Sequence, residues 1–192
     1  MLNIVLFGAP GCGKGTQAAK LKEKYGINHV STGEIIRSEI RRGTELGKQV
    51  EQCIANGQLA PDEVVTGIIA EYAASNLDCN GNIYDGYPRT TNQAESFDRI
   101  LAGHGLAVDL MIYMEVPEEE LIQRILLRGK ESGRADDASE EVIRTRIETY
   151  RAQTAVVAHH YSAQGKYEAV NGLGTVDEVF DRICAVIDKH VK

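Results

Sequence analysis

The chain has 192 residues, of which 43% are hydrophobic and 26% charged, a composition typical of one globular domain with a sizeable core. Its net charge of −7 argues against a general binder of nucleic acid or membrane surfaces, because such proteins present a basic face. No apolar run is long enough to cross a bilayer. The four cysteines form no C-x-x-C pair and no zinc spacing, so we expect reduced thiols in a cytoplasmic protein.

Short apolar runs alternate with helix-like stretches along the chain, which is typical of a parallel α/β sheet. The apolar N-terminal run lacks the basic lead of a signal peptide and is predicted to be the first strand. A long helix is expected from Ser139 through about Ala163, and a Thr175–Glu178 capping box predicts the last helix. The candidate strands are Leu2 to Phe7, Asn28 to Ser31, Asn82 to Asp85, Leu110 to Glu115 and Tyr167 to Asn171.

A glycine-rich loop follows the first strand and precedes a helix-like run. Gly8 to Thr16 reads GAPGCGKGT, and the spacing Gly8-x-x-x-x-Gly13-Lys14 fits the phosphate-binding loop. Its glycines let backbone N–H groups converge on phosphate oxygens, and its lysine reaches the outer phosphates. The general motif has Ser or Thr directly after the lysine to hold Mg²⁺, whereas here Gly15 follows and Thr16 comes one position later. We therefore expect no direct protein ligand to the metal.

The form GxPGxGKGTQ resembles that of the nucleoside monophosphate kinases, and the other motifs narrow the resemblance to the adenylate kinase family. The resemblance covers nearly the whole chain, from Leu2 to about Ile187. The C-terminal stretch VNGLGTVDEV resembles the loop that closes on the ATP adenine. The ATP-binding residues that the resemblance implies are Gly11, Cys12, Gly13, Lys14, Gly15, Thr16, Arg128 and Gly174.

Three further segments resemble the AMP site of this family. HVSTGEIIR, residues 29–37, contains nucleoside contacts and a phosphate-binding arginine, and GQLAPD, residues 57–62, closes over adenine. DGYPRT, residues 85–90, has tyrosine in place of the family's phenylalanine. The amide of Gln93 offers a donor and an acceptor to the adenine edge. The implied AMP-binding residues are Thr32, Gly33, Arg37, Gln58, Leu59, Ala60, Gly86, Tyr87, Pro88, Arg89, Gln93, Arg134 and Arg146.

Four arginines occur between residues 124 and 146. Arg124 and Arg128 are four apart and share one helix face, Arg134 follows in GKESGRADD, and Arg146 lies on the long helix. The spacing resembles the short-lid form of the family, with one residue added between the last two motifs. The lid has no Cys or His cluster, so we expect no structural zinc. The resemblance implies that these four arginines converge on the transferring phosphate. The catalytic residues that it implies are Lys14, Arg89, Arg124, Arg128, Arg134 and Arg146.

The resemblance implies an α/β P-loop three-layer fold with a central five-stranded parallel sheet. We expect one kinase domain, with a core of residues 1–30, 61–126 and 138–192, a helical NMP-binding insert at 31–60 and a short lid at 127–137. The expected activity is reversible, Mg²⁺-dependent transfer, ATP + AMP = 2 ADP, by a cytoplasmic monomer without nucleic-acid or membrane partners. Asp85 ends a strand and is placed to meet the Mg²⁺ water shell.

Three other classes of protein share part of this pattern. A UMP/CMP kinase shares the fold and the short lid, but Thr32 and Gln93 favour adenine. A GTP-binding switch reads guanine with an N-K-x-D motif, and no Asn-Lys pair occurs in this chain. A nucleic-acid-dependent ATPase is disfavoured by the acidic balance and by the lack of aromatic-basic patches.

Overall fold

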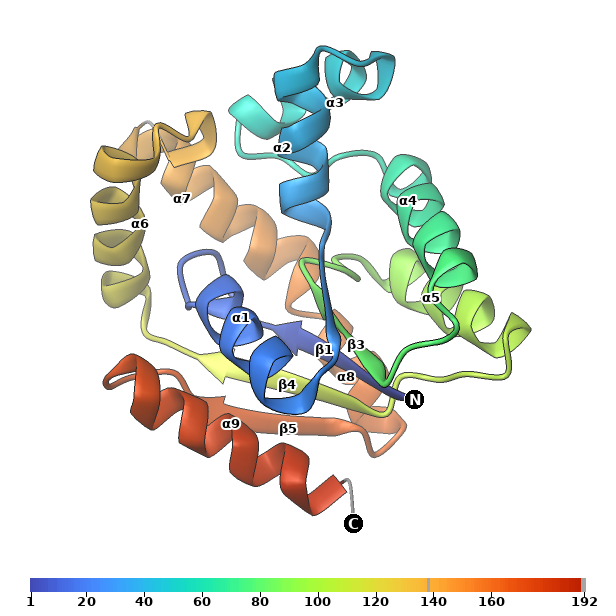
Figure 1. Cartoon of the computed structure of the whole chain (residues 1–192). Helices are drawn as coiled ribbons and strands as arrows, with labels where there is room; N and C mark the ends of the chain where they lie inside the picture. The colour runs from blue at the N-terminus through green and yellow to red at the C-terminus, as the bar shows by residue number, and fades with distance from the viewer. Residues whose placement is uncertain (138, 191–192) are drawn as a thin grey trace.

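The computed structural model describes residues 1–137 and 139–190, and it shows one parallel sheet between layers of helices (Figure 1). The strand order is β2-β3-β1-β4-β5, and every neighbouring pair is parallel. This confirms the predicted five-stranded α/β fold, although β3 begins one residue before the predicted start. The expected core segment 138–192 includes residues 138 and 191–192, which lie outside the described residues. The strands are β1 (Leu2–Phe7), β2 (Asn28–Ser31), β3 (Gly81–Asp85), β4 (Leu110–Glu115) and β5 (Tyr167–Asn171).

The helices follow the strands in the alternation that the sequence predicts. Among the described residues, no helix is both long and apolar enough to cross a membrane. The α-helices are α1 (Lys14–Tyr25), α2 (Thr32–Arg42), α3 (Glu45–Ala55), α4 (Asp62–Ser75), α5 (Thr91–Gly103), α6 (Glu118–Ser132), α7 (Glu140–Thr149), α8 (Val157–Ala163) and α9 (Val176–His190). A 3₁₀ turn, η1 (Ala135–Asp137), and a π-helical turn, η2 (Tyr150–Thr154), complete the set.

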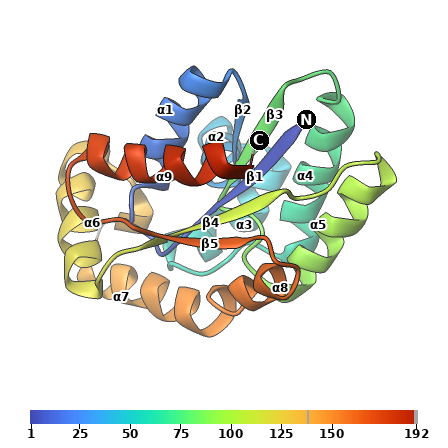
Figure 2. The same ribbon diagram turned by 90° about the horizontal axis from the view of Figure 1, so that it is seen from below.

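Successive residues of β1 face two different cores. Ile4 and Leu6 pack with residues of α1 and α9, whereas Val5 and Phe7 pack with residues of α4, α5 and α8. All four side chains are buried. Figure 2 shows α1 and α9 on one side of the sheet and α5 and α8 on the other. The nearly continuous apolar sequence of β1 is therefore explained by burial on both faces, as in other parallel sheets.

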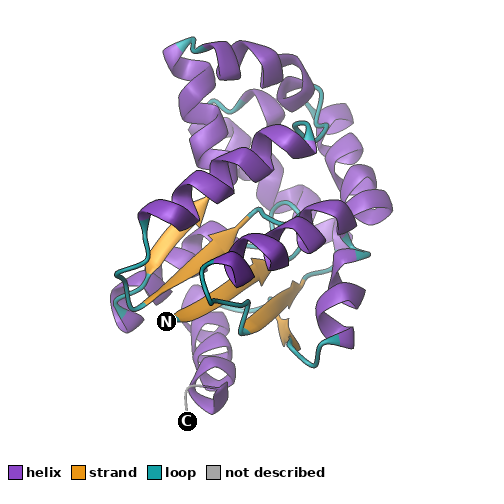
Figure 3. Cartoon of the chain, turned by 90° about the vertical axis from the view of Figure 1, so that its right-hand side faces the viewer, coloured by secondary structure: helices purple, strands orange, loops and turns teal. Residues whose placement is uncertain are grey.

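Two helical parts stand beyond the core sheet. α2 and α3 extend past the sheet at the top of Figures 1 and 3 and pack closely together. A Cβ added to Gly47 of α3 would lie 2.3 Å from the carbonyl oxygen of Glu39 in α2, so glycine permits this approach. α6 continues to Ser132, so the segment 127–137 begins as helix and ends in η1.

The continuous helix predicted from Ser139 to about Ala163 is wrong, because η2 separates α7 from α8. Within η2 the Ala155 N–H donates to the Tyr150 carbonyl, a bond that spans five residues instead of four. The buried positions 143, 147, 150, 154, 157 and 161 are spaced alternately by four and three residues. That spacing equals the pattern of an uninterrupted α-helix, so the sequence carries no sign of the extra residue.

Two Gly→Ala substitutions test the close pairing of β1 and β3. A Cβ at Gly81 would lie 2.1 Å from the Leu2 carbonyl oxygen, so G81A should lower the free energy of unfolding by about 1–3 kcal/mol. Gly67 in α4 has no heavy atom within 4 Å of its added Cβ, so G67A should raise that energy by about 0.5–1 kcal/mol. Urea unfolding measures both, and changes of the same sign would contradict the pairing.

Candidate active site

The loop between β1 and α1 has a backbone conformation that requires glycine. Gly8, Gly11 and Gly13 have φ values of 146°, 86° and 100°, a region that L side chains rarely adopt. α1 begins at Lys14, so the free N–H groups of its first turn lie at the loop. The Lys14 ammonium donates across the loop to the carbonyl oxygens of Gly8 at 2.7 Å and Ala9 at 3.2 Å. The loop is thereby built to receive an anion.

A cavity of about 350 Å³ lies at the carboxyl ends of β1 and β3. It brings together segments that are far apart in the sequence: the glycine loop, the start of α2, the α3–α4 connection, the loop after β3, and residues of α6 and α7. The residues expected from the sequence that line it are Gly11, Gly13, Lys14, Gly15, Thr16, Thr32, Gly33, Arg37, Gln58, Leu59, Ala60, Asp85, Gly86, Tyr87, Pro88, Arg89, Gln93, Arg128, Arg134 and Arg146.

Three expected site residues lie outside this cavity. Cys12 belongs to the loop but is buried, and Gly174 is exposed in the connection before α9. Arg124 donates to Glu120 one helical turn earlier at 2.8 Å and to the carbonyl of Gly172 at 3.4 Å. The structure therefore separates Arg124 from Arg128, although the two share one helix.

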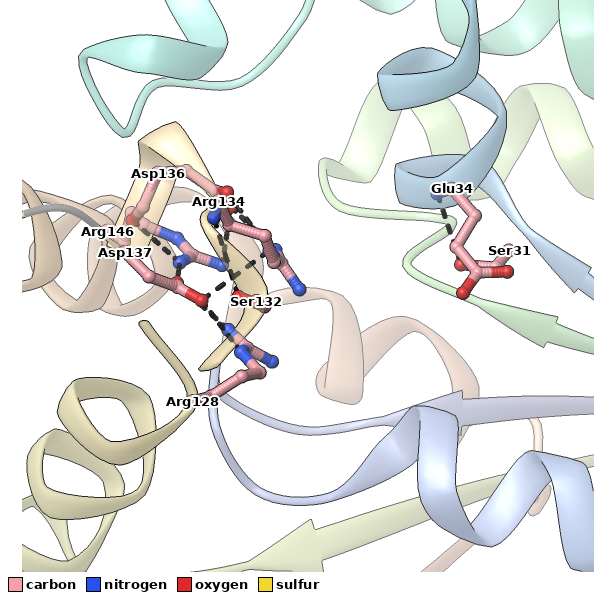
Figure 4. Close-up of polar contacts among 8 residues, drawn as sticks. All are labelled: Ser31, Glu34, Arg128, Ser132, Arg134, Asp136, Asp137 and Arg146. Carbon is pink, nitrogen blue, oxygen red and sulfur yellow. Dashed lines mark hydrogen bonds and ion pairs between the residues drawn. The ribbon is translucent and has the colours of Figure 1, made fainter. Parts of the chain in front are cut away.

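Arg128, Arg134 and Arg146, here called the lid arginines, converge on two adjacent carboxylates (Figure 4). Arg128 donates to both oxygens of Asp137, at 2.7 and 3.0 Å, and Arg134 donates to both oxygens of Asp136, at 3.1 and 2.7 Å. Arg146, from α7, forms ion pairs with both acids. The Asp137 side chain has no exposed surface. Bidentate pairs of this kind fix the guanidinium planes as well as their positions.

Burial and charge oppose each other at Asp136. Burial alone would raise the pKa of this carboxyl, but the hydrogen bonds from Arg134 and the positive charges of Arg146, Arg134 and Arg37 lower it to about 2. The carboxylate therefore remains charged throughout the neutral range. It offsets part of the repulsion among the arginines that surround it.

Two more arginines line the cavity, Arg37 from α2 and Arg89 from the loop after β3. Burial lowers the pKa of Arg37 to about 10, with a further contribution from the charge of Arg134. Burial also lowers the pKa of Arg89, and the charge of Arg146 adds to this effect. Arg89 Nε donates to the Gly86 carbonyl at 2.8 Å. Burial thus makes both positive charges costly, which favours an anionic partner.

Asp85 ends β3 next to the glycine loop. Burial would raise its pKa, but the contact with His29 and the positive charges of Lys14 and Arg89 lower it. His29 Nε2 lies 3.4 Å from Asp85 Oδ2, because β2 runs beside β3 in the sheet. The cavity therefore holds one ionised carboxylate close to the phosphate loop.

Gln93 and the α3–α4 connection form a further part of the cavity wall. Gln93 is 1% exposed and lines the cavity from the first turn of α5. Its Oε1 accepts from the Arg89 N–H at 2.7 Å, and its Nε2 donates to Asp62 at 2.7 Å. The α3–α4 connection forms the adjoining wall, where Gly57 lies so close to α7 that a Cβ would come within 2.9 Å of the Val142 carbonyl.

Sequence reasoning missed four polar residues of this region. All four hold side chains that the sequence did single out, but none was itself assigned a role. The available signal was position along the chain, since all four lie within quoted segments: residues 29–37, 57–62 and 129–137. The missed residues are His29, Asp62, Asp136 and Asp137.

The strand, glycine loop and helix, together with a cation-lined cavity at the carboxyl end of a parallel sheet, define a P-loop protein of the nucleotide phosphotransferase class. A family model described as "Adenylate kinase" matches residues 6–166. Relatives named adenylate kinase are 50% identical over 188 residues in Bacteroides fragilis, 51% over 189 in Bacteroides thetaiotaomicron and 47% over 188 in Flavobacterium johnsoniae. Each match covers 98% of this chain and at least 99% of the relative.

The chain belongs to the adenylate kinase family. The resemblance drawn from the sequence motifs is confirmed, and the UMP/CMP kinase alternative is not favoured. The chain is accordingly a nucleoside monophosphate kinase, a phosphotransferase.

Substitution D136N tests the charge balance of the arginine cluster. A carboxyl whose pKa is lowered on folding adds stability above its unfolded pKa, here 3.8, and that stability is lost as pH falls toward the folded value of about 2. The stability difference between the native chain and D136N should therefore be constant above about pH 5 and shrink between about pH 4 and 2. Urea unfolding at each pH measures it, and a pH-independent difference would contradict the assignment.

Proposed function

We propose that the chain transfers the terminal phosphoryl group of Mg·ATP to AMP and forms two ADP molecules. The observation that supports this most strongly is the convergence of Lys14, Arg37, Arg89, Arg128, Arg134 and Arg146 on one cavity. An acidic chain of net charge −7 has no general reason to gather six cations, but two phosphate tails that meet end to end provide one.

The proposal assigns the two ends of the cavity to the two nucleotides. The phosphate loop, with Gly11, Gly13 and Lys14 to Thr16, receives the ATP phosphates. Arg37 and Arg89 hold the AMP phosphate, and the wall of Gln58, Leu59 and Ala60 faces the adenine together with Gln93. The segment 31–60 is then the AMP-binding insert, and 127–137 is the lid. Arg124 is not assigned to the phosphates, because it donates hydrogen bonds to Glu120 and to the Gly172 carbonyl.

The chemistry needs positioning and charge neutralisation more than proton transfer. A phosphate oxygen of AMP attacks the terminal phosphorus of ATP, and the bond from that phosphorus to the bridging oxygen breaks. The acceptor oxygen is already anionic near neutral pH, because the second phosphate pKa is about 6, so no general base is required. The surrounding arginines stabilise the charge on the group in transit.

The acid pair Asp136–Asp137 explains how these arginines are kept in place before substrate arrives. Each carboxylate binds more than one guanidinium, so the arginines are held together through the two acids. Their charge is only partly balanced, since two acids face three lid arginines and also Arg37. The remaining positive field is available to phosphate.

Mg²⁺ accompanies ATP in the adenylate kinase family, and the residues present suit that ion. The Asp85 carboxylate and the Thr16 hydroxyl both line the cavity beside the loop. Mg²⁺ prefers a few protein oxygens together with water and phosphate oxygens. In the proposal, Asp85 holds the ion through its water shell. When bound, the ion neutralises charge on the phosphates.

A direct assay of acceptors tests this function. The protein is mixed with Mg·ATP and AMP, UMP or CMP, and the diphosphates are quantified. AMP should be converted at least about 100-fold faster than either pyrimidine nucleotide. Equal or faster use of CMP would contradict the proposal.

In the same assay, R128Q should lower kcat by on the order of 10³-fold, as expected for a cation at the moving phosphoryl group. The matched control is R144Q on α7, whose arginine is exposed and paired with Glu140. R144Q should leave the rate within about twofold of the native chain, as is usual for surface ion pairs.

A further inference from the structure

The Gln93 amide is held by partners whose chemistry fixes which way it points. The Arg89 backbone N–H, 2.7 Å away, can only donate, so the group that faces it must be the amide oxygen. The Asp62 carboxylate, also at 2.7 Å, can only accept, so the group that faces it must be the NH₂. Turning the amide over would place N–H against N–H and oxygen against oxygen. The orientation therefore follows from hydrogen-bond chemistry.

Asp62 is itself fixed by a second contact. It opens α4 directly after the wall residues 58–60, and its other carboxylate oxygen accepts from the Thr90 hydroxyl at 2.8 Å. That hydroxyl caps α5 by accepting the Gln93 backbone N–H at 3.2 Å. Both oxygens of Asp62 are thus used to join the starts of two helices at the edge of the cavity.

The two contacts leave half of the Gln93 amide unused. A primary amide has two N–H donors and two oxygen lone pairs, and each partner takes one. One donor and one acceptor therefore remain for a ligand in the cavity that Gln93 lines. Adenine offers a donor at its 6-amino group and an acceptor at N1. Hypoxanthine offers the reverse, an acceptor at O6 and a donor at N1, which only a reversed amide can match.

We propose that Asp62 helps determine the choice of purine, because its carboxylate and the Arg89 backbone N–H together lock the Gln93 amide in the orientation that pairs with adenine and rejects hypoxanthine. This inference rests on the proposed function, in which Gln93 faces the base of the acceptor nucleotide. Asp62 is a positioning residue. It acts on the base only through Gln93.

The test compares D62N with E63Q, using AMP and IMP as acceptors. D62N keeps the size of the side chain, but the carboxamide at position 62 can donate or accept, so only the Arg89 N–H still opposes reversal of the Gln93 amide. E63Q removes the same charge from the same first turn of α4 at an exposed position. The measurement is kcat/KM for each acceptor, from the ADP and IDP formed with Mg·ATP.

The IMP-to-AMP ratio of kcat/KM should rise on the order of tenfold in D62N and stay at the native value in E63Q. D62A, which also removes the acceptor, should raise the ratio similarly and serves if D62N does not fold. A purely structural role would lower both kcat/KM values by one factor. An unchanged ratio in folded D62N and D62A would overturn the inference alone. If the native chain forms no ADP from AMP, the proposed function itself fails.

Discussion

The structure depends on holding five arginines and a lysine around one cavity against their mutual repulsion. Burial, with a smaller contribution from neighbouring arginines, lowers the pKa of Arg37 and Arg89, which reflects the cost of burying these cations near one another. Asp136 and Asp137 reduce that cost for the lid arginines through bidentate contacts. Two phosphate tails would reduce it further, so the arrangement favours a polyanionic ligand over the empty site.

The fold supplies the geometry that this charge cluster requires. β1 and β3 end at the cavity, so the glycine loop and Asp85 arrive there from neighbouring strands. Arg37 comes from α2, Arg89 from the loop after β3, Arg128 and Arg134 from α6 and the turn after it, and Arg146 from α7. The α3–α4 connection adds the wall of residues 58–60. Burial on both faces of β1 anchors the strand from which the phosphate loop departs. Rigid elements thus position groups that repel one another.

Features with local sequence patterns could be predicted, and features made by tertiary pairing could not. The apolar strands and the glycine loop are encoded in short contiguous runs, and both were predicted correctly. The π-helical turn keeps the α-helical spacing of buried residues, so the sequence pattern gives no sign of it. Asp62 binds Gln93, 31 positions away, and such contacts have no sequence period. Arg124 shares the helical spacing of Arg128, yet its partners Glu120 and Gly172 hold it elsewhere.

The central claim is that arginines from separate segments act on the same phosphoryl group. A double-mutant cycle of R89Q and R146Q, measured as the single-turnover rate of phosphoryl transfer, tests it most directly. Residues that act as a unit are strongly non-additive, so the double variant should be slower than either single variant by less than about tenfold. Effects that multiply, giving on the order of 10⁶-fold for two losses of 10³, would show that the arginines act independently and would contradict the account.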